Sequence, residues 1–241
     1  MKIKLGISFS SLPVLFAVHK STATRIFYSV LHVLVQKTAT WIYKPSNLVI
    51  EATLPPAFRI HYPKCKFIID CTEIKIETPP TIEQQRAMYS TYKSCFTVKY
   101  LVGILPNGMI AFVSSGYGGR TSDTAITLAS GFLDLVEPGD QVLSDKGFPG
   151  IRDCIANKNA VLVMPPFSSG AEPFSEQQMQ DTHKIAQVRI HVERAIQRIK
   201  LYNILSRKVP VTLIEYMDKI FHMCCVLANL QPHIFRQSGN D

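Results

Sequence analysis

Three acidic residues are spaced through the chain as a metal-dependent nuclease would require. Asp70 and Asp145 each end a short apolar run, and Glu193 lies in a stretch with helical spacing. Carboxylates at the ends of two buried strands and on one helix face can converge on a point, because strands and helices fix side chains better than loops do. Carboxylate oxygens suit the hard cations Mg²⁺ and Mn²⁺, which in turn promote phosphate chemistry. The three residues therefore predict a nuclease site.

Each of these acids also has an ordinary structural explanation. Asp70 could be a turn residue at a strand end, and Asp145 could belong to an Asp-Lys-Gly turn. Glu193 could form an ion pair with Arg189, four residues earlier on the same helix. All three explanations would have to hold together, which favours the catalytic interpretation.

Basic side chains accompany the acids and would suit a phosphate backbone. Some lie on the same helix as Glu193 and others lie next to an acid in the sequence, although a merely solvated charged face would look similar. The candidates for DNA contact are Arg120, Lys146, Arg189, Arg194 and Lys200.

Composition limits the class of protein. The 241 residues are 46% hydrophobic and 18% charged, with a net charge of +8, which fits a globular chain that attracts polyanions. Six cysteines without a C-x-x-C pair are expected to be reduced, buried thiols. The absence of HExxH, G-x-S-x-G and a phosphate-loop Lys-Ser/Thr argues against zinc, serine-hydrolase and P-loop chemistry. No apolar stretch is long enough to span a bilayer, so no membrane partner is expected.

The N-terminal segment, residues 1–40, predicts a partial helix-turn-helix. One short helix is expected over residues 10–17 and a second from an N-cap at Ser21, with Pro13 poorly placed inside the first. A plain helical hairpin packed on the main domain explains the pattern equally well. The proline-rich residues 41–64 predict a linker.

The following residues, 65–208, alternate in a definite order. Strands are expected at 66–76, 98–105 and 109–115, with a turn at Pro106-Asn107-Gly108. A helix (123–135), a strand (141–144), a helix (151–157), a strand (160–164) and a long helix (176–201) follow. This order predicts an α/β ribonuclease-H-like core with helices on both faces. Residues 209–241 are expected to add a C-terminal helix, apolar nearly all round over 213–230 and therefore buried.

Several blocks resemble the DDE superfamily endonucleases, most closely Harbinger-type transposases and their domesticated derivatives. They include FIIDCTEIKI (67–76), YSTYKS (89–94), GGRTSD (118–123), GDQVLSDKGF (139–148) and RIHVERAIQRIK (189–200). The resemblance covers about residues 60–205, and the blocks occur in the expected order.

The resemblance implies a ribonuclease-H-like core that cuts and joins DNA. Asp70, Asp145 and Glu193 match the acidic triad, and Asp123 matches a further acid of the metal site. Because Thr121-Ser122-Asp123 is also an N-cap signature, the sequence leaves open whether Asp123 is a metal ligand or a helix cap. The expected cofactor is Mg²⁺, with Mn²⁺ as a substitute, in a pair of sites about 3.5–4 Å apart.

The same resemblance implies double-stranded DNA as the main partner and the nucleus as the location, with the cytoplasm left open. A separate DNA-recognition protein and a homo-oligomer are further expected partners. The alternative is a domesticated, catalytically silent DNA- or protein-binding factor that keeps the transposase fold.

Overall fold

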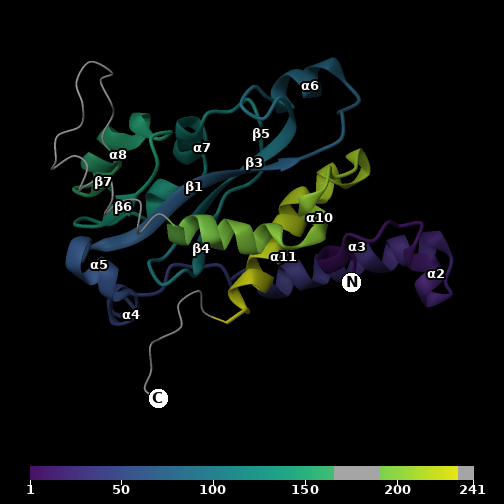
Figure 1. Ribbon diagram of the computed structural model, residues 1–241, viewed down its shortest axis with the longest axis horizontal. Coiled ribbons are helices and arrows are strands. Elements are labelled where there is room, and N and C mark those ends of the chain that lie inside the picture. The colour runs from purple at the N-terminus through teal and green to yellow at the C-terminus, as the bar shows by residue number, and fades with distance from the viewer. Residues whose placement is uncertain (166–189, 233–241) are drawn as a thin grey trace.

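A mixed β-sheet forms the centre of the protein (Figure 1). The structure, a computed structural model, describes residues 1–165 and 190–232. The strands run in the order β2-β3-β1-β6-β7, with β4 and β5 also paired to β3. β1 is antiparallel to β3 and parallel to β6. The strands are β1 (Cys65–Lys75), β2 (Tyr89–Ser90), β3 (Cys95–Ile104), β4 (Ile110–Val113), β5 (Tyr117–Gly118), β6 (Gln141–Leu143) and β7 (Val161–Val163).

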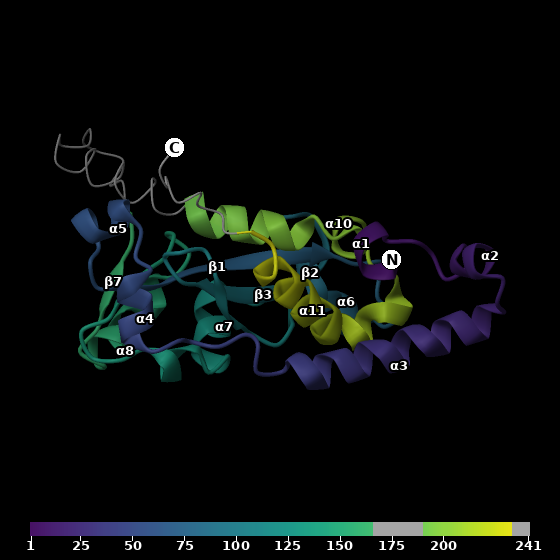
Figure 2. The same cartoon turned by 90° about the horizontal axis from the view of Figure 1, so that it is seen from below.

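Both faces of the sheet are buried. Along β1, Ile68 and Ile74 enter one hydrophobic cluster, while Phe67 and Ile69 enter a second cluster on the opposite face. A strand covered on both faces must be apolar at consecutive positions, which explains the run that begins at Phe67. The helices α7 and α8 lie on the second side, and α11 and the helical residues 190–200 lie on the first (Figures 1 and 2).

The helices follow the predicted alternation. Four helices that cover the sheet or border it are α3 (Lys20–Thr38), α7 (Asp123–Ala129), α8 (Arg152–Ala156) and α11 (Met217–Asn229). Further helices are α1 (Lys2–Leu5), α2 (Leu12–Phe16), α4 (Asn47–Ala52), α5 (Pro56–His61), α6 (Ile82–Met88) and α10 (Asn203–Ser206). Three 3₁₀ segments are η1 (Phe132–Leu135), η2 (Pro149–Ile151) and η3 (Val211–Tyr216). The predicted α/β ribonuclease-H-like core is confirmed.

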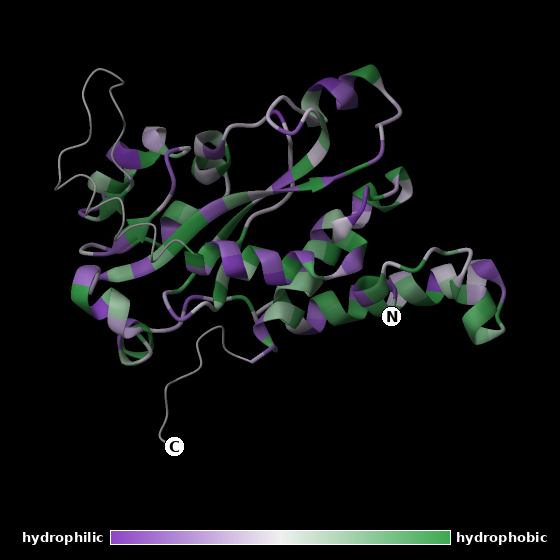
Figure 3. Cartoon of the chain, in the orientation of Figure 1, coloured by the Kyte–Doolittle hydropathy of each residue, from purple (hydrophilic) through white to green (hydrophobic). Residues whose placement is uncertain are grey.

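Local signals located most elements correctly. The turn at Pro106-Asn107-Gly108 joins β3 to β4, with Gly108 at φ 88° and its N–H donating to Leu105 O. The inward residues of the helix at 190–200 are buried as expected, including Val192 and Ile199. Figure 3 shows hydrophilic and hydrophobic positions alternating along this helix, the pattern of an element that lies between core and solvent. Residues 176–189 of the predicted long helix lie outside the described part of the chain.

Four local predictions were wrong. Residues 41–64 contain α4 and α5, because Pro56 occupies the first turn of α5, where a missing N–H costs nothing. The helix expected over 123–135 divides at Gly131, whose φ of 79° ends it before η1. His19, not Ser21, caps α3, since its ring accepts the Ser21 N–H. Pro13 sits in the first turn of α2, a position that tolerates proline.

The N-terminal helices contact the rest of the protein through α1, which packs on α10, and through α3. α3 packs beside α11 (Figure 2), with the Tyr28 and Tyr216 ring centroids 4.1 Å apart. Leu31 is 2% exposed at this contact, whereas Thr38 forms a hydrogen bond with His222. Among residues 1–165 and 190–232, no helix combines the length and apolarity needed to cross a membrane.

Candidate active site

The site opens where β6 ends and β1 continues. Ile68 pairs with Leu143 at the end of β6, so that Asp70 and Asp145, each two residues further on, come to neighbouring positions. Beyond this point the edge of β1 faces a cavity of about 530 Å³. The charged residues that line the cavity are Asp70, Glu73, Asp123 and Asp145, with Lys93, Lys99 and Lys200. Four carboxylates and three ammonium groups thus share one space.

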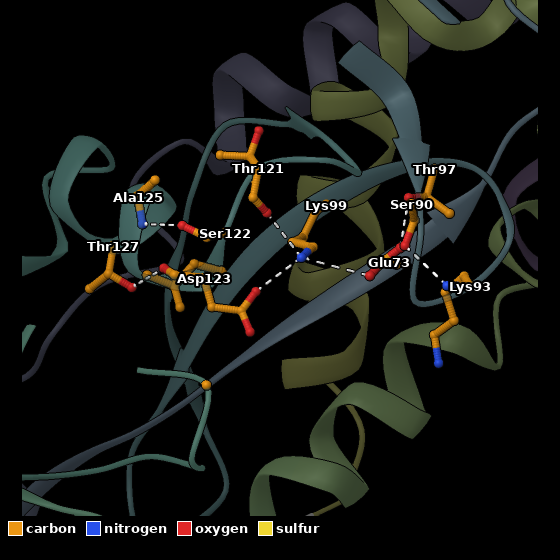
Figure 4. Close-up of polar contacts among 12 residues, drawn as sticks. Glu73, Ser90, Lys93, Thr97, Lys99, Thr121, Ser122, Asp123, Ala125 and Thr127 are labelled. Atoms are coloured by element: carbon orange, nitrogen blue, oxygen red, sulfur yellow. Dashed lines mark hydrogen bonds and ion pairs between the residues drawn. The ribbon is translucent and has the colours of Figure 1, made fainter. Parts of the chain in front are cut away.

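Asp123 enters this cavity from the first turn of α7. The N-cap of α7 is Ser122, whose Oγ accepts the Ala125 N–H at 3.2 Å. The carboxylate of Asp123 is therefore not needed as a cap, and its Oδ1 accepts a hydrogen bond from Lys99 Nζ at 3.1 Å (Figure 4). The structure settles the cap alternative against Asp123 and leaves its carboxylate available to the cavity.

Lys99 connects two carboxylates across β1 and β3. It lies opposite Glu73 in the register, and its Nζ is 3.7 Å from Glu73 Oε1 and 3.0 Å from the carbonyl oxygen of Thr121. Thr97 Oγ1 donates to the other Glu73 oxygen at 2.7 Å (Figure 4). Burial by itself would lower the pKa of Lys99. The hydrogen bond to Asp123 and the negative charges of Asp123 and Glu73 outweigh burial, so the pKa of Lys99 is raised.

Sequence reasoning missed Glu73 and Lys99. Both are charged residues inside strands that also carry apolar runs, with side chains only 8% and 12% exposed. Charged side chains are rarely buried unless they are paired. That signal was present in the sequence, but their pairing depends on the register of β1 against β3, which the sequence does not give.

Asp145 is oriented by its own loop. The N–H of Gly147 donates to Asp145 Oδ1 at 2.7 Å. A Cβ at Gly147 would lie 3.0 Å from this oxygen and 2.8 Å from Asp123 Oδ2. The carboxylates of Asp123 and Asp145 therefore approach each other over a residue that has no side chain, and any side chain there would enter the space between them.

Glu193 lies at the edge of this arrangement. It belongs to the helical residues 190–200, whose Ile196 and Lys200 line the cavity. Residues three and seven positions apart share a helix face, so Glu193 stands on the face toward the cavity, one turn before Ile196. Glu193 is exposed and is not among the residues that line the cavity. The structure thus brings together Asp70, Asp123 and Asp145, with Glu193 at the rim.

The predicted basic residues divide into separate groups. Lys200 lines the cavity, where burial, with the nearby charge of Lys93, lowers its pKa despite the opposing charges of Asp70 and Glu73. Lys146 is exposed beside Asp145. Arg194 is also exposed, but it lies roughly 100° around the helix from Glu193. Arg120 lies at a different cavity, and Arg189 falls outside the described residues.

The comparisons with known proteins identify the family. Residues 69–229, about two thirds of the chain, match the family described as DDE superfamily endonuclease. Residues 1–40 match the helix-turn-helix of DDE superfamily endonuclease. The chain belongs to the DDE superfamily endonucleases. No curated protein matches the sequence significantly.

Membership of the DDE superfamily implies a divalent metal and a transposase-type nuclease, and its helix-turn-helix suggests DNA binding. The donor set of this endonuclease fits such a metal chemically, since carboxylate oxygens are preferred by hard cations. The gap over Gly147 supports the fit, because two carboxylate oxygens face the point that a methyl group would fill. In residues 1–165 and 190–232, however, no three His, Cys, Asp or Glu side chains form a group that could hold a metal. Asp123 forms an ion pair with Lys99, whose Nζ lies 3.1 Å from Asp123 Oδ1.

Proposed function

We propose that the chain is a DNA endonuclease of the Harbinger transposase type that cleaves, and also joins, DNA strands with two divalent cations. Mg²⁺ is the expected cofactor and Mn²⁺ its substitute. One observation carries the proposal: Asp70, Asp123 and Asp145 line one cavity at the end of β6 in the sheet of a DDE superfamily endonuclease.

The carboxylates would hold the cations, and the lysines would hold the DNA. Asp70, Asp145 and Glu193 are the proposed catalytic ligands, and Asp123 is a further metal ligand. Bound cations would supply activation of the attacking oxygen and neutralisation of the leaving oxygen. Lys99 orients Asp123 through its Oδ1, so that Oδ2 faces Asp145 across Gly147. This arrangement sets the direction of one ligand before any metal binds.

Lys93 and Lys200 would position the scissile phosphate. Both line the cavity beside the carboxylates and repel each other; burial, together with the charge of Lys93, lowers the pKa of Lys200. A phosphate between them would relieve this repulsion and would receive charge-assisted hydrogen bonds. Lys146, Arg189 and Arg194 are proposed to contact the DNA further from the scissile bond.

The test combines metal binding with cleavage. Mn²⁺ is titrated against the wild type, Asp70→Asn, Asp145→Asn and Glu193→Gln, and both melting temperature and nicking of supercoiled plasmid are measured. We expect Mn²⁺ to raise the wild-type melting temperature and to permit nicking. Each variant should lose nicking and much of the metal-induced shift, while its plasmid binding remains. Asp153→Asn, at an exposed position on α8 outside the cavity lining, is the matched control and should behave as the wild type.

A silent, domesticated factor would give a different result. It would bind plasmid with no metal-induced shift and no nicking in any variant, and this outcome would replace the nuclease proposal. Nicking at the normal rate by one variant alone would remove that residue from the site.

The location and the partners remain proposals. We propose a nuclear location, because the proposed substrate is DNA and the net charge of +8 suits a polyanionic partner. Imaging of the tagged chain would test this, since uniform exclusion from the nucleus would contradict it. A separate DNA-recognition protein and a homo-oligomer stay predictions of the family resemblance, to be examined by sedimentation of the chain with and without DNA.

A further inference from the structure

A second cavity, of about 420 Å³, is lined by residues of the same β2–β3 turn that borders the carboxylate cavity. It is formed by α6, by β2 with the first residues of β3, and by the segment that follows β5. Arg86, Tyr89, Phe96 and Arg120 line it, and no acidic residue does. α6 and β5 lie next to each other at this end of the molecule (Figure 1). The cavity is therefore a basic and aromatic surface next to an acidic one.

Close backbone packing holds the two arginines at this cavity. A Cβ at Gly118 would collide with the carbonyl group of Ala87, so β5 approaches α6 as closely as glycine allows. The Arg120 N–H then donates to Ala87 O at 3.3 Å. The backbone of Arg120 is in this way fixed against the end of α6 that carries Arg86. Two guanidinium groups at one cavity attract an anion, and their planar forks suit phosphate in particular.

Tyr89 gives the cavity an aromatic surface. Its ring meets that of Phe96 edge-on, with centroids 5.5 Å apart and an interplanar angle of 73°. Phe96 supports the ring, yet the Tyr89 residue remains 40% exposed. An exposed ring held by a neighbour loses little entropy when it stacks on a flat ligand. Guanidinium groups beside such a ring are the combination that binds unpaired nucleotides, with phosphate on the cations and base on the ring.

The β2–β3 turn connects this cavity to the carboxylates. Ser90 Oγ accepts the Lys93 N–H at 3.2 Å, which fixes the turn (Figure 4). Tyr92 and Lys93, in the turn, line the carboxylate cavity, while Tyr89, at its start, lines the second cavity. Tyr92 is 82% exposed, and Lys93 Nζ lies 4.3 Å from its ring centroid. Each of the two cavities that this short turn borders is thus lined by an aromatic ring and a cation.

We propose that the second cavity binds an unpaired nucleotide of the DNA substrate. Its base stacks on Tyr89, its phosphate contacts Arg86 and Arg120, and the strand continues over Tyr92 and Lys93 to the carboxylates. A duplex would keep its bases paired and could offer only phosphates to this surface, which leaves the exposed Tyr89 ring without use. This inference rests on the proposed function for the identity of the nucleic acid, but the binding that it describes needs neither metal nor cleavage.

The experiment measures binding of the full chain to short DNA in EDTA. The probes are a single-stranded ten-residue oligonucleotide carrying one 2-aminopurine and its duplex with the complementary strand. We expect the single strand to bind more tightly and its 2-aminopurine fluorescence to be quenched on stacking. Tyr89→Leu keeps the packing on Phe96 and should weaken single-strand binding about tenfold, with loss of quenching. Tyr43→Leu, at a tyrosine that is 53% exposed elsewhere, is the matched control and should change neither quantity.

Three results would overturn the proposal. The first is equal affinity for single strand and duplex. The second is wild-type quenching by a Tyr89→Leu protein with an unchanged melting temperature. The third is weaker binding in Arg86→Gln and Arg120→Gln but not in Tyr89→Leu, which would make the cavity a phosphate-backbone site. Plasmid nicking separates this proposal from the previous one: nicking without Tyr89-dependent binding contradicts only the nucleotide cavity, whereas Tyr89-dependent binding without nicking contradicts only the nuclease.

Discussion

At the scale of single residues, the acidic cavity is balanced internally by lysine. Lys99 lies between Asp123 and Glu73, with side chains that are 12%, 25% and 8% exposed. Partly buried carboxylates repel one another unless a cation compensates them. Lys99 provides that compensation from β3 and at the same time fixes the direction of Asp123.

Lys99→Met should destabilise the protein by about 2–4 kcal/mol, because it leaves two partly buried carboxylates without their partner. Mn²⁺ should stabilise this variant more than the wild type, since the cation would replace the positive charge that the carboxylates have lost. Differential scanning fluorimetry with and without Mn²⁺ measures both effects. Lys93→Met, at an exposed position, should leave the metal-free melting temperature nearly unchanged. A Lys99→Met protein as stable as the wild type would show that the pair contributes little.

Gly147→Ala should weaken metal binding without unfolding the protein. The added Cβ would meet Asp123 Oδ2 at 2.8 Å and Asp145 Oδ1 at 3.0 Å, so both carboxylates must turn away. Carboxylate ends are flexible, and the metal-free melting temperature should therefore change by only a few degrees. The expected loss of Mn²⁺ affinity is about tenfold, the low end for a disturbed ligand shell. Unchanged affinity would mean that the cation does not bind between these two carboxylates.

At the scale of elements, the contact of α3 with α11 attaches the helix-turn-helix segment to the catalytic core. The Tyr28 and Tyr216 rings pack at one end of this contact. At the other end, Thr38 Oγ1 donates to Leu34 O, so it accepts the hydrogen bond from His222 Nε2 at 3.2 Å. His222 must then be the tautomer protonated at Nε2, and burial lowers its pKa although the contact with Thr38 opposes this shift.

The α3–α11 contact should weaken in acid. An unfolded histidine has a pKa near 6.5, and that of folded His222 is lower, so the unfolded chain binds a proton more readily. The contribution of neutral His222 to the stability of the folded protein is therefore complete above pH 6.5 and declines as the pH falls below that value. Melting temperatures at pH 7.5 and 5.5 should differ less in His222→Gln, which can still donate to Thr38, than in the wild type. Equal differences in the two proteins would exclude His222 as a source of the acid sensitivity.

At the scale of the whole molecule, the net charge of the chain differs from the charge of the carboxylate cavity. The net charge of +8 provides attraction for DNA over a wide surface. The cavity at the end of β6 is by contrast nearly balanced, with four carboxylates and three lysines. The attraction of the whole molecule for DNA should therefore depend strongly on salt.

Lys146→Gln should weaken DNA binding broadly and reduce the slope of log affinity against log salt by about 1, because one phosphate contact is lost. Fluorescence anisotropy of a labelled duplex at several salt concentrations measures the slope. Lys64→Gln removes an equal charge from an exposed position just before β1, away from Asp145, and should leave the slope unchanged. Equal slopes for all three proteins would remove Lys146 from the DNA contact surface.

The sequence alone determined the order of the elements and the candidate acids. Apolar runs, the Asn107-Gly108 turn and helical spacing are local signals, and they placed β1, β3, β6 and the buried α11 within a few residues. Local signals failed where one residue was ambiguous. Proline inside a helix and proline at its first turn look alike in sequence, so α5 was taken for part of a linker.

The tertiary structure decided which side chains meet. The register of β1 against β3 put Lys99 opposite Glu73, and the end of β6 left β1 open beside Asp145. The tertiary structure also places Arg120 with Arg86 at the second cavity, not at the cavity that the acids line. Such pairings join residues far apart in the chain, and a shift of one residue in a strand would reverse every side chain to the other face. No local pattern contains that information, because the register is fixed only when both faces of the sheet are buried together.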